Sequence, residues 1–198
     1  MTLIALAGAG WWLFSLDGGI DLTGGQTTSA MSQYAAYTGD KPGLLVTFEY
    51  PQGWDVHEEQ GKAQFYREVR ILGPRNQEET YTAYLSVRGS PLKPFGGRHE
   101  ALDELVANYK NHLLQGAQIV SEQPRTIGGT NGVDLTVSYI MPAIHHKGLK
   151  AQAVPVTSRT VFLENGPYLC ELTFSADARE YEQHAPAFEH LLGSFRFQ

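Results

Sequence analysis

The sequence predicts an α+β fold in which an antiparallel β-sheet is covered by two α-helices. Segments that alternate apolar and polar residues recur along the chain with short turns between them, and strands joined in this way pair antiparallel. Two other segments repeat their apolar residues at the spacing of an amphipathic helix. Hydrophobic residues make up 42% of the 198 positions, which is enough for a packed core.

An uncharged segment opens the chain, and we expect it to form an apolar helix that anchors the protein in a membrane. Sixteen helical residues rise only about 24 Å, less than the roughly 30 Å of a bilayer core, so a signal peptide and a buried helix stay open as alternatives. Tryptophan is typical of membrane interfaces. The segment covers residues 1–16, and its expected membrane contacts are Leu3, Ile4, Leu6, Trp11, Trp12, Leu13 and Phe14.

A spacer rich in Gly, Thr and Ser is expected at 17–43, followed by one folded domain at 44–198. The domain begins with a strand whose apolar residues Val46, Phe48 and Tyr50 share one face. A Pro-Gly turn ends this strand just before Trp54, because proline cannot donate to a sheet and glycine tolerates a positive φ. Two further strands are expected at 65–72 and 80–88.

The first helix of the domain is expected at 99–115. Its apolar face consists of Leu102, Leu105, Val106, Tyr109 and Leu113, and Gly116 follows where a helix commonly ends.

Two hairpins follow this helix, the first across the glycine-rich turn 128–132 and the second ending near Ser175. In the strand at 133–141, Asp134, Thr136 and Ser138 alternate with apolar residues, which predicts a face exposed to water. The lone Cys170 lies in phase with apolar strand residues and is expected to be buried.

A second helix is expected to end at Leu192, ahead of a short strand at 194–197. Asp177 and Glu180 have the spacing of a capping box, which favours a start at Asp177. A start near His184 would instead place Pro186 in the first turn, where proline is tolerated.

Several local sequences, in this order and spacing, resemble the PsbP-type domains, a fold shared by lumenal proteins of photosystem II and the Ran-binding Mog-type proteins. They are Phe48-Glu-Tyr-Pro-Gln-Gly-Trp54, Asn131-Gly132 before the strand through Tyr139, Arg159, Asn165-Gly166 before Tyr168-Leu169, and the end from Ala187 to Phe195. The resemblance covers 44–198. It implies a PsbP-like sandwich and the role of an extrinsic, non-catalytic subunit that supports a membrane complex.

We therefore expect a non-catalytic accessory or assembly subunit on the periplasmic or lumenal side of an integral membrane protein complex, with photosynthetic and electron-transfer complexes among the candidates. The alternative is a periplasmic module that binds a small ligand or a metal, with its cleft near the loop at 142–157. Trp54 is either a core anchor or an exposed aromatic at the partner surface, where tryptophan is favoured.

The composition and motifs favour no nucleic acid partner, enzyme activity, cofactor or metal. With a net charge of −6 and no basic run longer than a pair, the chain lacks the stripe that neutralises phosphates. We find no nucleophile elbow, zinc-protease motif or phosphate loop. The adjacent His145 and His146 have no acidic residue in their loop, and His184 and His190 lie on different helix faces. His57 precedes two glutamates in what reads as a solvated charge run.

Overall fold

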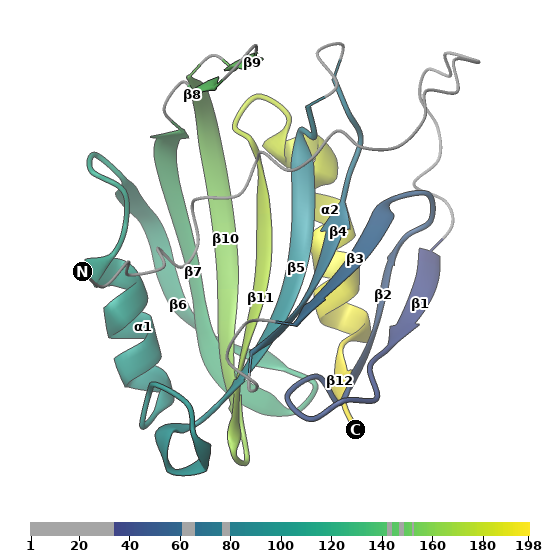
Figure 1. Ribbon diagram of the computed structural model, residues 1–198, viewed down its shortest axis with the longest axis vertical. Helices are drawn as coiled ribbons and strands as arrows, with labels where there is room; N and C mark the ends of the chain where they lie inside the picture. The colour runs from purple at the N-terminus through teal and green to yellow at the C-terminus, as the bar shows by residue number, and fades with distance from the viewer. Residues whose placement is uncertain (1–33, 61–65, 77–79, 142–143, 147–148, 152) are drawn as a thin grey trace.

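The computed structural model describes residues 34–60, 66–76, 80–141, 144–146, 149–151 and 153–198 (Figure 1). A seven-stranded antiparallel sheet forms the centre, in the order β3-β4-β5-β11-β10-β7-β6. These strands are β3 Asp55–Gln60, β4 Arg67–Leu72, β5 Ala83–Pro91, β6 Gln118–Ile127, β7 Thr130–Met141, β10 Val154–Asn165 and β11 Tyr168–Asp177. A smaller sheet, in the order β1-β2-β12, consists of Tyr34–Thr38, Val46–Pro51 and Arg196–Phe197.

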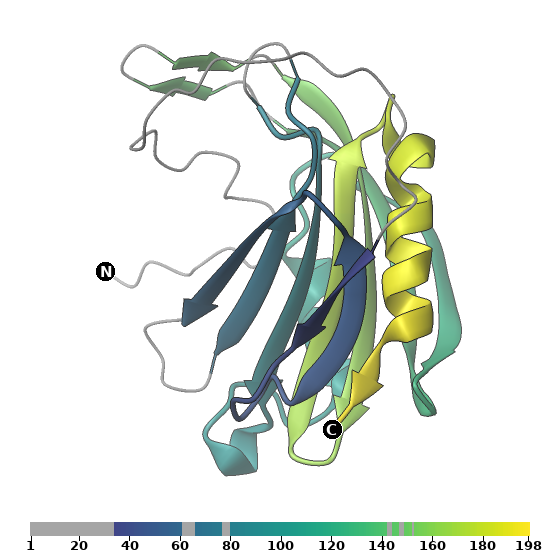
Figure 2. The ribbon, with the colours of Figure 1, turned by 90° about the vertical axis from the view of Figure 1, so that its right-hand side faces the viewer.

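The two helices pack on opposite faces of the seven-stranded sheet, and α2 covers one face along its length (Figure 2). Helix α1 is Leu102–Asn111 and helix α2 is Tyr181–Ser194; a short 3₁₀ turn, η1, lies at Lys93–Phe95. The predicted α+β fold with antiparallel strands and two covering helices is therefore confirmed. In the described part of the chain, no helix is long and apolar enough to cross a membrane.

The larger core lies between α2 and the sheet. Phe188 and Leu191 of the helix pack there with Phe48 of β2 and with Leu172 and Phe174 of β11, all of them essentially without solvent exposure. Cys170 belongs to the same cluster, so the prediction that this cysteine is buried is confirmed.

The smaller core lies under α1. Leu105 and Val106 pack there against Phe162 and Leu169 of the sheet, as the apolar face predicted from the sequence requires. The helix starts later than expected because the backbone N–H of Leu102 donates to a side-chain oxygen of Glu164, 2.9 Å away on β10. A carboxylate at a helix N-terminus satisfies an otherwise unpaired donor and complements the helix dipole.

Strands β1 and β3 lie where the sequence indicated none. Strand β1 falls within the expected spacer at 17–43 and pairs with β2, so the folded region starts before residue 44. Tyr37 of β1 stacks on Phe48 at 4.9 Å, which joins the strand to the core. Strand β3, although highly charged, pairs along the edge of the large sheet, where Asp55 and the four residues after it are exposed to water.

The second helix differs from both expected starts. It begins at Tyr181, and Pro186 lies inside it. Asp177 does not form the capping box with Glu180; instead its carboxylate accepts hydrogen bonds from the backbone and side chain of Arg179. Packing of Phe188 and Leu191 against the sheet offsets the loss of one helical hydrogen bond at the proline, so tertiary contacts determine this start.

The hairpins lie where the sequence predicted them, but the face of β7 that was expected to be exposed to water is partly buried. The β6–β7 turn is tight, with Gly128 and Gly129 both at positive φ (55° and 84°), as a two-residue hairpin turn requires. The loop expected after β7 contains two short paired strands, β8 Ile144–His146 and β9 Leu149–Ala151. The expected wet face of β7 is wrong at Asp134, which is 1% exposed because α2 covers it.

Residues 1–16 lie outside the described residues, so the expected membrane contacts Leu3, Ile4, Leu6, Trp11, Trp12, Leu13 and Phe14 stay a prediction.

We expect the region 33–198 to fold by itself and to need β1. A protein starting at residue 33 should melt cooperatively, whereas one starting at residue 43 loses the stacking of Tyr37 on Phe48 and of Tyr34 on His190. The shorter protein should lose roughly 2–4 kcal/mol of unfolding free energy, the scale of one buried aromatic and its ring contact. Urea unfolding of both proteins measures this difference; equal midpoints would show that β1 adds no stability.

Candidate functional site

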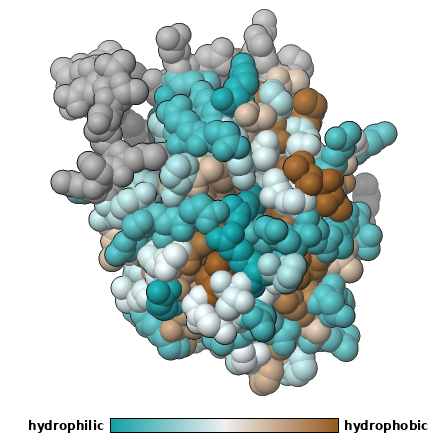
Figure 3. Space-filling view, turned by 180° about the vertical axis from the view of Figure 1, so that it is seen from behind, coloured by the Kyte–Doolittle hydropathy of each residue, from teal (hydrophilic) through white to brown (hydrophobic). Residues whose placement is uncertain are grey.

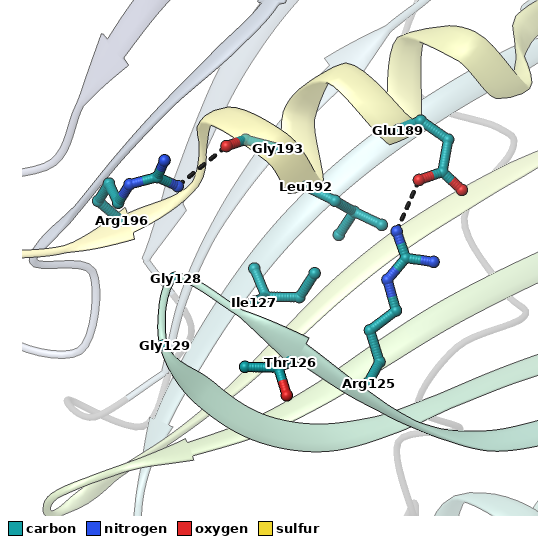
Figure 4. Close-up of a pocket in the computed structure, with 9 residues that line it drawn as sticks. All are labelled: Arg125, Thr126, Ile127, Gly128, Gly129, Glu189, Leu192, Gly193 and Arg196. Atoms are coloured by element: carbon teal, nitrogen blue, oxygen red, sulfur yellow. Dashed lines mark hydrogen bonds and ion pairs between the residues drawn. The ribbon is translucent and has the colours of Figure 1, made fainter.

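An open pocket of about 570 Å³ lies between the β6–β7 turn and the C-terminal end of α2 (Figure 4). Its floor is apolar, because Ile127 and Leu192 contribute their side chains there and both are buried in the core behind it. The remaining lining residues are Arg125, Thr126, Gly128, Gly129, Glu189, Gly193 and Arg196.

The tight turn brings the walls of this pocket together. A side chain at Gly128 would lie 3.0 Å from the backbone oxygen of Phe195, so the turn packs directly against the chain leaving α2. Only a residue without a side chain combines this close approach with the left-handed backbone of the turn. The sequence 128–132 thus sets both the hairpin and the edge of the pocket.

A closed ring of four charged side chains forms one wall and extends into the protein. Arg159 donates two hydrogen bonds to the carboxylate of Asp134, at 2.9 and 2.6 Å, and a third to Glu189 at 2.6 Å. Arg125 donates to Glu189 at 2.6 Å and to Asp134 at 3.4 Å. We call these four residues the ion ring. It joins strands β6, β7 and β10 to helix α2.

The ion ring favours the charged forms of Glu189 and Arg159. Burial alone would raise the pKa of Glu189, but the hydrogen bonds from Arg159 and Arg125 outweigh it, so the pKa lies below the ordinary value. Hydrogen bonding to Asp134 and Glu189 likewise raises the pKa of Arg159, against the effect of its partial burial. The ring contains two positive and two negative charges, so it is electrically balanced.

Arg196 differs from the other two charged residues that line the pocket, Arg125 and Glu189, which pair with each other. Its Nη1 donates to the backbone oxygens of Gly193, at 2.9 Å, and Phe195, at 2.6 Å. No carboxylate in the described part of the chain pairs with it. The pocket therefore combines an uncompensated guanidinium with an apolar floor, an arrangement suited to binding an anion that carries an apolar group.

The polar residues on this face of the molecule form a band across its middle (Figure 3). Hydrophobic surface shows between them (Figure 3). Val120 of β6 and Ile140 of β7 are more than half exposed.

Trp54 lies near the other end of α2 from the pocket. It is partly buried against the larger core, its ring meets that of His184 edge-on at 6.0 Å, and a side chain at Gly73 would be 3.1 Å from it. The tryptophan thus has the packing of a core anchor and still reaches the surface. Whether a partner contacts it stays a prediction.

His184 is buried beneath this tryptophan, with 3% exposure and no hydrogen bond to either ring nitrogen from the described residues. Its Nε2 lies 3.6 Å from a carboxylate oxygen of Glu180, which is beyond hydrogen-bond distance. Burial lowers the pKa of His184, and the nearby Glu180 offsets only part of this effect. The neutral form is therefore favoured in the folded protein.

The other histidines and acids considered from the sequence do not converge. Glu58, beside His57, accepts from Tyr37 and pairs with Lys41, and Glu59 pairs with Arg70, so these acids hold strand β3 in ion pairs. The side chains of His145 and His146 lie outside the described part. Within that part, no group of three or more His, Cys, Asp or Glu residues could hold a metal ion.

The sequence analysis did not identify the pocket residues Arg125, Glu189 and Arg196. A signal was present in two strands, because Asp134 in β7 and Arg159 in β10 are charged residues with apolar residues near them. Charged residues in such positions are usually paired when they are buried.

Comparisons with known proteins find one matching family and several solved structures of similar fold. The PsbP family model matches residues 33–197. No curated protein matches the sequence. A crystal structure from Bacteroides thetaiotaomicron VPI-5482 superposes with a TM-score of 0.50 at 13% identity over 82% of this chain, and the match spans only 48% of that chain.

Two other solved structures are similar at a lower level. Cyanobacterial PsbP (CyanoP) from Synechocystis sp. PCC 6803 has a TM-score of 0.49 at 19% identity, covering 89% of this chain and 98% of that chain. LpqN of Mycobacterium tuberculosis, described as involved in cell envelope biogenesis, has a TM-score of 0.48 at 19% identity, covering 83% and 90%.

Asp134→Asn should test the contribution of the ion ring to stability. The substitution keeps the shape of the side chain but removes the negative charge to which Arg159 donates. Asp134 is only 1% exposed, and removing one partner of a buried ion pair lowers the unfolding free energy by about 3 kcal/mol. Chemical denaturation measures the loss. As a control, Glu100→Gln breaks the solvent-exposed pair with Lys93 and should leave stability nearly unchanged. Equal effects of the two substitutions would contradict a structural role for the ring.

His184 should make the protein less stable as the pH falls from about 7 to about 5. The unfolded chain takes up a proton near the ordinary pKa of 6.5, whereas the folded chain resists it because its pKa is lowered. The unfolded state then binds more protons, so stability present above this pH is lost as the pH decreases.

Replacing His184 with Phe should remove this pH dependence, while His57→Gln, at an exposed position, should preserve it. Glu68 and Glu189 do not explain a loss of stability between pH 7 and pH 5. Their pKa values in the folded protein lie below the ordinary 4.5, so their contribution to stability is lost mainly at lower pH. Thermal melting across the pH range gives the result, and an unchanged slope in His184→Phe would disprove the assignment.

Proposed function

The chain belongs to the PsbP family, and from this premise we propose that it is a non-catalytic accessory subunit bound to the extracytoplasmic side of a membrane protein complex. The observation that carries the proposal is the family match over 33–197, which includes both sheets and both helices. Lumenal members of this family are extrinsic subunits that support a membrane complex without doing its chemistry. Photosynthetic and electron-transfer complexes are candidate partners on the same ground.

We propose that Trp54 contributes to the surface that contacts the partner. Its chain neighbour Asp55 accepts a hydrogen bond from the hydroxyl of Tyr81 at 2.9 Å, and Arg75 stacks 4.5 Å from the Tyr81 ring. Trp, Tyr and Arg are the residues that most often dominate the energy of protein interfaces. Their side chains here are held in place before binding, which reduces the entropy lost on association.

The apolar segment at 1–16 supports the second part of the proposal, attachment to the membrane. In this arrangement the segment inserts through Leu3, Ile4, Leu6, Leu13 and Phe14, with Trp11 and Trp12 at the interface. The polar residues that follow it, up to the first described strand, would connect the anchor to the domain.

A small-ligand module in the periplasm is the second candidate function. The pocket beside α2 favours it, because an uncompensated arginine over an apolar floor is a binding arrangement that an ordinary packed surface does not need. The two functions are compatible, since Trp54 and the pocket lie near different ends of the helix.

Copurification from the native membrane tests the proposed function. The full-length tagged protein should be recovered with integral membrane proteins after mild detergent extraction, and a protein starting at residue 33 should leave the membrane fraction. Trp54→Ala should reduce the recovered partner severalfold, since hot-spot truncations cost about 2 kcal/mol or more. Phe95→Ala, at an aromatic that is 58% exposed on η1, serves as the matched control.

Folding must be checked in parallel because Trp54 also packs against the core. Trp54→Phe keeps an aromatic ring there and should retain both the melting temperature and most of the partner. Recovery of the same membrane proteins by all variants, the shortened protein included, would contradict the anchor and the Trp54 surface. Recovery of the full-length protein without any membrane protein would contradict the accessory role itself.

A further inference from the structure

We propose that the pocket between the β6–β7 turn and the end of α2 binds a monocarboxylate that carries an aliphatic group, with Arg196 as the residue that recognises the carboxylate. This inference does not depend on the accessory role, because it rests on the lining of the pocket alone (Figure 4).

Arg196 is held in a position from which it can bind a ligand. Its Nη1 donates to the backbone oxygens of Gly193 and Phe195, which hold the guanidinium beside the C-terminal end of α2, where Arg196 lines the pocket (Figure 4). The remaining donors, on Nε and Nη2, have no hydrogen-bond partner among the described residues. Two adjacent N–H groups of one guanidinium match the two oxygens of a carboxylate.

The charge of the site favours a single negative charge. Arg125 and Arg159 are balanced by Asp134 and Glu189 in the ion ring, so Arg196 leaves an excess of one positive charge. The carbonyl end of α2 would disfavour an anion, but Arg196 already donates to the exposed oxygen of Gly193 there. A doubly charged phosphate would call for more cations than the pocket offers.

The apolar floor of the pocket favours an aliphatic group attached to the carboxylate. Ile127 and Leu192 are 5% and 2% exposed, so the small surface that they show to the pocket is apolar and rigidly packed. Gly129 and Gly193 at the rim have no side chain, and a Cβ built on either meets nothing within 4 Å. An aliphatic side chain of the ligand can therefore reach the floor and displace water from it.

The test compares an acid with its uncharged analogue on the full-length protein. N-acetyl-leucine contains a carboxylate next to an aliphatic side chain, and N-acetyl-leucinamide differs only in lacking the charge. We expect the acid to bind, measured by NMR chemical-shift titration and calorimetry, and the amide to bind at least roughly tenfold more weakly, because charge-assisted hydrogen bonds are lost.

Substitutions locate the site. Arg196→Gln should weaken binding of the acid roughly tenfold, with Arg196→Lys intermediate because it keeps the charge but not the paired donors. Gly193→Leu places a side chain in open space at the pocket and should abolish binding without loss of stability, since leucine favours a helix more than glycine does. Arg98→Gln, at an exposed arginine outside the pocket, is the control and should bind like the original protein.

The result that would overturn the proposal is equal binding of acid and amide, no binding of either, or binding that survives both Arg196→Gln and Gly193→Leu in protein with an unchanged melting temperature. Tripeptides that end in leucine, with a free or an amidated C-terminus, identify the source of the carboxylate. Tighter binding of the free-ended tripeptide than of N-acetyl-leucine assigns the site to the C-terminus of a polypeptide, and equal binding assigns it to a small acid. None of these outcomes affects the copurification test of the accessory role.

Discussion

The contact of Arg159 with Asp134 and Glu189 fixes how helix α2 lies on the large sheet. Asp134 and Arg159 come from neighbouring strands, and Glu189 comes from the helix, so the hydrogen bonds align the helix with the strands beneath it. Apolar packing supplies most of the driving force for this contact but is not directional. The ion ring adds direction, because its donors and acceptors meet in one arrangement only.

Both candidate binding features depend on that alignment. At the end of α2, the helix brings Gly193 and Arg196 beside the turn at Gly128, and this juxtaposition creates the pocket. Near its start, the helix places His184 under Trp54 and so keeps the tryptophan at the surface of the core. The helix thus links the pocket near its end with the tryptophan near its start.

Most buried polar side chains of the described residues are hydrogen-bonded; ring nitrogens of His99 and His184 are the exceptions. Arg88 pairs with Glu171 on the opposite face of the sheet, and Ser158 bonds Ser175 at 2.6 Å. His184 has no such hydrogen bond among the described residues. Burial lowers the pKa of His184, so charging this histidine at low pH opposes folding near the Trp54 end of α2.

The sequence by itself determined the fold class, the apolar face of α1, the burial of Cys170 and the positions of the hairpins, because side-chain periodicity and glycine turns act over a few neighbouring residues. Strand β1, the burial of Asp134 and the start of α2 were decided by the tertiary structure. Each depends on a contact outside its own segment: Phe48 for β1, Arg159 for Asp134, and the sheet for the helix that contains Pro186. The pocket belongs to the same class, since Arg125 of β6 and Arg196 of β12 are far apart in the sequence and meet only when α2 packs on the sheet. Local patterns contain no information about such distant pairs, so only the folded chain could bring them together.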